Sequence, residues 1–117
     1  MFGMLREAKE DKHRLEFRLT TPFYRSHERI DPAKVFRRIR RGRRCPFLYL
    51  IALSEKAGEL MTIYSADELG ASVYEGQRFI VCGIGRGRRR TLFLLEQMIT
   101  DMYKDEKSID VAHYFTF

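Results

Sequence analysis

The chain has 117 residues, 44% of them hydrophobic, and a formal net charge of +6. This length corresponds to one ordinary domain, and the apolar content excludes an intrinsically disordered chain. No apolar run approaches the ~20 residues of a membrane-spanning helix, which argues against a membrane protein. The first residues also lack the apolar stretch of a signal peptide.

The N-terminal part predicts a polar segment and then a strand. Residues 1–13 are expected to be poorly ordered or to form a short helix, followed by a single α/β domain over residues 14–117. In "RLEFRLT" the apolar side chains of Leu15, Phe17 and Leu19 alternate with charged ones, which is typical of a strand with one buried face.

A loop and a helix are predicted next. The stretch "TPFYRSHERI" is interpreted as a loop because Pro22 interrupts it. Asp31 before Pro32 is a favourable helix start, an N-cap followed by proline at the first helical position. This helix is expected to end near Gly42.

Three further elements are predicted between residues 47 and 70. The run "FLYLIAL" (residues 47–53) is apolar throughout, which suits a strand covered on both sides. The run "ELMTIYS" (residues 59–65) fits either a hairpin strand or a helical turn, and we favour the strand. Ser65 and Glu68 have the spacing of a capping box and predict a short helix.

The last third contains a second apolar strand, "RFIVCGI", and the longest predicted helix, from Arg88 to about Tyr103. The buried stripe of this helix is expected at Leu92, Leu95, Ile99 and Met102, widened by Leu94 and Met98. The alternation over residues 111–117 indicates a last strand or a docked tail.

This order of elements predicts an α/β or α+β fold in a small single domain. We expect a two-layer sandwich, in which a mixed sheet of about four to five strands packs against two main helices. The residues contain no motif that identifies a known family.

Arginines dominate the positive charge and form two clusters on an otherwise mildly acidic chain. Arginine cluster 1 comprises Arg37, Arg38, Arg40, Arg41, Arg43 and Arg44, and arginine cluster 2 comprises Arg86, Arg88, Arg89 and Arg90. The planar guanidinium fork suits phosphate and carboxylate oxygens. A helix C-terminus favours one or two cations of cluster 1, but six in eight positions repel one another, so a solvated helix face and an anion-binding surface are both open interpretations.

Cluster 2 raises a sharper question because it coincides with a predicted helix start. There the helix dipole disfavours each cation by ~0.3–1 kcal/mol, and a bound anion would reverse that effect. Gly83, Gly85 and Gly87 would let the backbone approach such an anion closely. The alternative is a tight strand-to-helix turn whose glycines serve packing and whose arginines reach solvent.

The relation between the clusters depends on strand direction. If the two apolar strands are parallel neighbours, cluster 1 precedes one strand and cluster 2 follows the other, so they lie at opposite sheet edges. Antiparallel strands would bring them to the same edge.

No catalytic or metal-binding constellation is visible, and we expect no cofactor. His13, His27 and His113 match no metal spacing. Cys45 and Cys82 form no metal-type pair, which indicates a reducing, cytoplasmic location. Cys45 follows two arginines that could lower its pKa, although an ordinary cysteine is the stronger interpretation. The rings in the apolar strands, Phe47 among them, are expected to pack in the core.

We therefore expect a non-enzymatic module that binds a polyanion, with nucleic acid ahead of an acidic protein partner. The candidate residues are Gly85, Gly87 and Arg86, Arg88, Arg89 and Arg90, with Arg37, Arg40, Arg41, Arg43 and Arg44 in support. Two alternatives stay open: a small phosphorylated ligand held by the strand–GIGRG–helix turn, and a structural or regulatory interaction domain, such as a homodimer, with no ligand.

Overall fold

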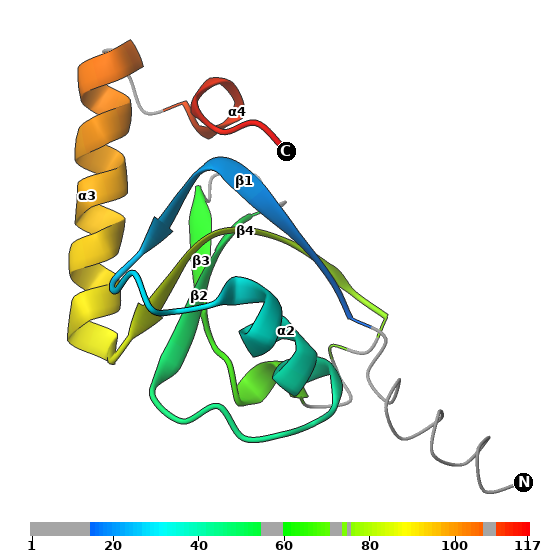
Figure 1. The fold of residues 1–117 in the computed structure, drawn as a ribbon. Coiled ribbons are helices and arrows are strands. Elements are labelled where there is room, and N and C mark those ends of the chain that lie inside the picture. Colours follow the sequence, from blue (N-terminus) through cyan, green and yellow to red (C-terminus); the bar gives the residue numbers. More distant parts are fainter. Residues whose placement is uncertain (1–14, 55–59, 71–73, 75, 107–109) are drawn as a thin grey trace, which may run out of the picture.

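The computed structural model describes residues 15–54, 60–70, 74, 76–106 and 110–117 (Figure 1). The N-terminal segment predicted over residues 1–13 lies outside them. The elements in chain order are β1 (Glu16–Arg25), α2 (Pro32–Arg40), β2 (Leu48–Leu53), β3 (Met61–Ser65), the short 3-10 helix η1 (Glu68–Gly70), β4 (Arg78–Arg86), α3 (Arg88–Glu106) and α4 (Val111–Tyr114).

The strands form a mixed four-stranded sheet in the order β1-β4-β2-β3. β1 runs parallel to β4, while β2 is antiparallel to both β4 and β3. The predicted mixed sheet is confirmed with four strands, and the ambiguous segment before Ser65 is the hairpin strand β3. The topology is consistent with the α+β alternative.

The sheet is covered by helices on both faces, so the molecule has three layers rather than the expected two (Figure 1). On one face, Val35, Phe36 and Ile39 of α2 pack with Leu50 of β2 in a core cluster. On the other face, Ile51, Cys82, Phe115 and the α3 methionines Met98 and Met102 form a second cluster. Successive strand residues point to opposite faces, so unalternating apolar strands need a helix on each side.

β1 is longer than the sequence predicts because it sits at the edge of the sheet. It continues through Pro22 to Arg25, where a loop was expected. An edge strand tolerates proline, which cannot donate to a ladder. The pairing of β1 with β4 shifts register between Leu19 and Tyr24, and Leu19 is 43% exposed instead of buried.

α2 forms as its local signals predict. The Asp31 carboxylate accepts a hydrogen bond from the Ala33 amide at 3.1 Å, and Pro32 begins the helix. The helix ends at Arg40, two residues before Gly42, which has a φ of 69°. The short helix after β3 also follows its signal, because the Glu68 side chain accepts a hydrogen bond from the backbone N–H of Ser65 at 2.7 Å.

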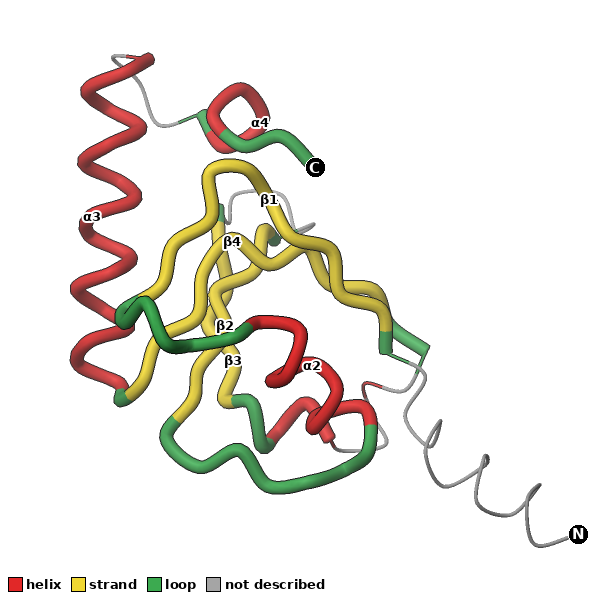
Figure 2. Tube along the Cα trace, in the orientation of Figure 1, coloured by secondary structure: helices red, strands yellow, loops and turns green. Residues whose placement is uncertain are grey.

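α3 begins at Arg88 as predicted, but its buried face is rotated. Thr91 is fully buried, whereas Leu92 is 46% exposed. The tail beyond it is docked rather than a strand: α4 is followed by the buried Phe115, and Thr116 exchanges backbone hydrogen bonds with Thr21 of β1 (Figure 2).

Candidate anion-binding pocket

The antiparallel pairing of β2 and β4 brings the two arginine clusters to one edge of the sheet. Leu48 at the start of β2 pairs with Arg86 at the end of β4. The loop that carries the end of cluster 1 therefore meets the strand end that begins cluster 2. The parallel arrangement, which would have separated the clusters, is wrong for this protein.

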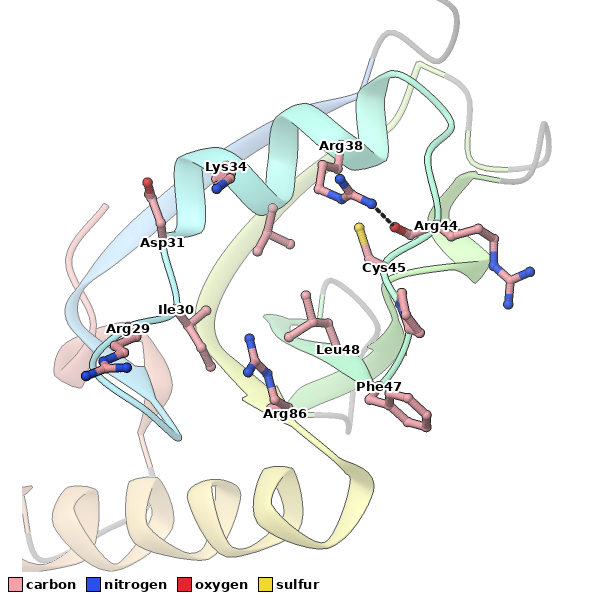
Figure 3. Close-up of a pocket in the computed structure, with 12 residues that line it drawn as sticks. Arg29, Ile30, Asp31, Lys34, Arg38, Arg44, Cys45, Phe47, Leu48 and Arg86 are labelled. Atoms are coloured by element: carbon pink, nitrogen blue, oxygen red, sulfur yellow. Dashed lines mark hydrogen bonds between the residues drawn. The ribbon is translucent and has the colours of Figure 1, made fainter.

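A pocket of about 430 Å³ lies where these segments meet (Figure 3). Its lining residues are Arg29, Ile30, Asp31, Lys34, Val35, Arg38, Arg44, Cys45, Pro46, Phe47, Leu48 and Arg86. Five of these side chains are cationic and one is a carboxylate. Since the Asp31 carboxylate caps α2, the lining carries an excess of positive charge.

Arg38 and Arg86 extend toward the pocket from opposite sides (Figure 3). Arg38 donates a hydrogen bond to the backbone carbonyl of Arg44 at 2.7 Å, which holds its guanidinium over the loop before β2. Arg86 is fixed through its backbone, whose N–H donates to Ser26 Oγ at 2.9 Å. The apolar residues Ile30 and Leu48 line the pocket on either side of Arg86 (Figure 3).

Asp67 fixes the loop on the far side of the pocket. Its carboxylate accepts a hydrogen bond from the Cys45 amide at 2.6 Å and pairs with Arg44 Nε at 3.3 Å. The Arg44 guanidinium consequently points away from the pocket (Figure 3). Arg44 therefore contributes to the pocket mainly through its backbone carbonyl, which accepts the hydrogen bond from Arg38.

The remaining members of cluster 1 lie outside the pocket. Arg40 has a structural role, because its Nε donates to the Leu15 carbonyl at 2.9 Å and its guanidinium lies 5.4 Å from the centre of the Phe17 ring. The other three, Arg37, Arg41 and Arg43, are exposed on the end of α2 and the following turn.

The arginines of cluster 2 beyond the pocket are exposed and occupy the first turn of α3. That turn contains no acidic residue. Within the described part of the chain, Arg88, Arg89 and Arg90 form no ion pair. The structure therefore keeps the feature that the sequence predicted, three arginines in the first turn of α3 with no acidic residue in that turn.

The glycines next to these arginines have packing and backbone reasons of their own. Gly83 belongs to β4, within the strand that the sequence predicted. β4 then continues through Gly85 to Arg86, where the sequence suggested a loop. A Cβ on Gly85 would lie 2.8 Å from Thr91 Cβ and 2.9 Å from Thr91 Cα, so the glycine lets α3 pack closely against β4. Gly87 has a φ of 84°, and its N–H donates to the Phe47 carbonyl at 2.6 Å. These contacts explain Gly85 and Gly87 without a ligand.

Several residues of the pocket were not among the candidates chosen from the sequence. Arg38 belongs to cluster 1 but was left out of the candidate residues, although it lines the pocket. Arg29 and Lys34 lie outside both clusters, and only the fold brings them to the pocket. Phe47 was expected in the core, but it precedes β2, is 76% exposed and has a φ of 66°.

Cys45 contributes a buried thiol to the lining of the pocket. Burial raises the pKa of Cys45, and the hydrogen bond with Arg38 opposes that shift only in part. The raised pKa agrees with the ordinary cysteine that the sequence favoured, and not with the weaker alternative of an activated thiol. Among the residues that the structure describes, no group of three or more His, Cys, Asp or Glu side chains could hold a metal ion. Within the same residues, no helix is both long and apolar enough to cross a membrane.

Comparisons with protein-family models, with curated proteins and with solved structures gave no match, so the functional argument rests on this geometry.

Proposed function

We propose that the protein is a nucleic-acid-binding module that recognises the phosphate backbone through the pocket at the β2–β4 edge. The observation that carries this proposal is the convergence of Arg38 and Arg86, from different clusters, on one cationic pocket. Guanidinium groups supply charge-assisted hydrogen bonds to phosphate oxygens, and a concave site lets more than one of them reach the same anion.

The surrounding charge supports a polymer rather than a single small anion. Positive side chains continue beyond the pocket, to Arg37 on α2 and Arg41 directly after it, and to Arg88 and Arg89 on α3. A small phosphorylated ligand would need only the pocket. Successive phosphates of a nucleic acid would use the outlying cations as well, and would gain affinity from counterion release.

The test is salt-dependent binding of labelled oligonucleotides, measured by fluorescence anisotropy with the full chain. We expect the affinity to fall steeply with salt, and Arg86→Gln and Arg38→Gln each to lower the slope of log Kobs against log salt by about 0.7 to 0.9. Arg18→Gln is the matched control, because it removes the same charge from an exposed position of β1 outside the pocket.

Two results would contradict the proposal. One is the absence of binding to any oligonucleotide at low salt. The other is an equal loss of affinity in Arg18→Gln and Arg86→Gln, which would mean that binding depends on the net charge of the protein and not on the pocket. Binding of an acidic peptide, with no oligonucleotide binding, would favour a protein partner instead.

A further inference from the structure

We infer that the module binds single-stranded nucleic acid, and that Phe47 is the platform on which an unpaired base stacks. This inference rests on the proposed function and adds the class of nucleic acid that the site accepts. It begins from an observation that phosphate binding alone does not explain: a large aromatic side chain is exposed in the middle of a cationic surface.

The exposure of Phe47 is not forced by its sequence neighbours. Leu48 and Leu50 are buried or half-buried in the same stretch, yet the Phe47 ring is 76% exposed and points outward at the rim of the pocket (Figure 3). Exposing an apolar ring of this size forgoes the stabilisation that burial provides. A solvent-facing ring next to guanidinium groups is the arrangement that single-strand-binding proteins use to stack bases.

The backbone of Phe47 holds the ring in this position. Its φ of 66° lies in the left-handed region, which costs a non-glycine residue conformational energy. The Phe47 carbonyl accepts the Gly87 N–H at 2.6 Å, and this bond ties the residue to the junction between β4 and α3. Phe47 is thus anchored between the two clusters, with Arg44 three residues before it and Arg86 paired with the next residue, Leu48.

The geometry matches the parts of a nucleotide. A base can lie on the Phe47 ring at the rim while its phosphate enters the pocket between Arg38 and Arg86. Duplex DNA cannot use this arrangement, because the faces of its bases are stacked on one another and only base edges and the backbone are available. A single strand offers both the phosphate and the face of an unpaired base.

The experiment compares four probes of equal length with the wild-type chain: oligothymidylate, oligouridylate, a DNA duplex and an abasic single strand that keeps the phosphates. We expect the two single strands to bind more tightly than the duplex and the abasic strand. Comparing oligothymidylate with oligouridylate tells whether the sugar also matters.

Phe47→Gly is the main variant, because glycine accepts the left-handed φ and the fold does not depend on the exposed ring. It should weaken binding of the single strands roughly 5- to 150-fold and leave binding of the abasic strand unchanged. Phe47→Tyr should keep the wild-type affinity. Tyr103→Ala is the control, because this ring is also exposed on α3 but lies fifteen residues after Arg88, near the other end of the helix.

The outcomes separate the inference from the proposed function. Salt-dependent binding that is equal for duplex, abasic and single strands, or that is unaffected in the Phe47 variants, would overturn the stacking role and leave backbone recognition intact. Loss of binding to all probes in Arg38→Gln and Arg86→Gln, together with selective loss in Phe47→Gly, supports both.

Discussion

The close approach of α3 to β4 at Gly85 gives a prediction that tests the fold itself. In Gly85→Ala the added methyl group would overlap Thr91 Oγ1 and lie 2.9 Å from Thr91 Cα. Because Cα is a backbone atom, the overlap can be relieved only by moving the start of α3 away from the sheet. Overpacking of this kind costs about 1–3 kcal/mol, and a backbone contact favours the upper part of that range.

A matched comparison is available two residues earlier in the same strand. A Cβ on Gly83 would meet Met98 Cε, the far end of a flexible side chain, and would lie 3.3 Å from the Tyr24 carbonyl oxygen. Methionine can change rotamer to make room, so Gly83→Ala should cost about 1 kcal/mol or less.

The assay is urea unfolding followed by circular dichroism, with thermal melts as a second measurement. At about 2–3 kcal/mol, Gly85→Ala should lower Tm by roughly 8 °C or more. The double variant Gly85→Ala/Thr91→Ala should recover part of the loss, because it removes the hydroxyl and methyl groups that the new Cβ meets. If Gly83→Ala destabilises the protein as much as Gly85→Ala, the packing explanation of Gly85 is wrong.

Two further predictions concern titratable groups. Burial, followed by hydrogen bonds with Tyr114 and Asp101, raises the pKa of Tyr24, so the stability contributed by its neutral form is complete below the unfolded pKa of about 10 and declines as the pH rises above it. Urea unfolding over a pH series should therefore show a steeper alkaline loss in the wild type than in Tyr24→Phe, and parallel curves would contradict this. Burial raises the pKa of Cys82 to about 12 and also raises that of Cys45, so neither thiol should react with a disulfide reagent at neutral pH until the protein is unfolded. Rapid reaction of either thiol in the native protein would contradict its burial and its raised pKa.

Local signals in the sequence were sufficient for most of the elements. Asp31 and Pro32 define a helix start through their own capping geometry, and unalternating apolar runs mark strands covered on both faces. The expected two-layer sandwich was wrong, because helices cover both faces of the sheet. The apolar runs of β2 and β4 already implied two covered faces, so the sequence contained the information for three layers. Leu92 was misplaced because periodicity fixes the buried stripe only approximately, while the contact between Thr91 and Gly85 determines the actual rotation of α3.

The candidate pocket could be predicted only in part, because it depends on strand order. Both clusters are visible in the sequence, but their meeting requires the antiparallel pairing of Leu48 with Arg86. That pairing is a long-range property that no local pattern encodes. Arg29 and Lys34 reach the pocket for the same reason, and Phe47 leaves the core because β2 begins one residue later than its apolar run.

The central position of β4 has a consequence for how the chain acquires its structure. β4 lies between β1 and β2, yet it follows both in the chain, and its ladder with β1 joins Glu16 to Arg78. Among the strands that the structure describes, only β2 and β3 can pair as a local hairpin. The other ladders of these strands must each close a long loop first, which is an entropic cost that slows such topologies. On the ribosome, β1 has no neighbour until β4 has emerged, so nascent chains that stop after β3 carry an incomplete sheet with an exposed edge.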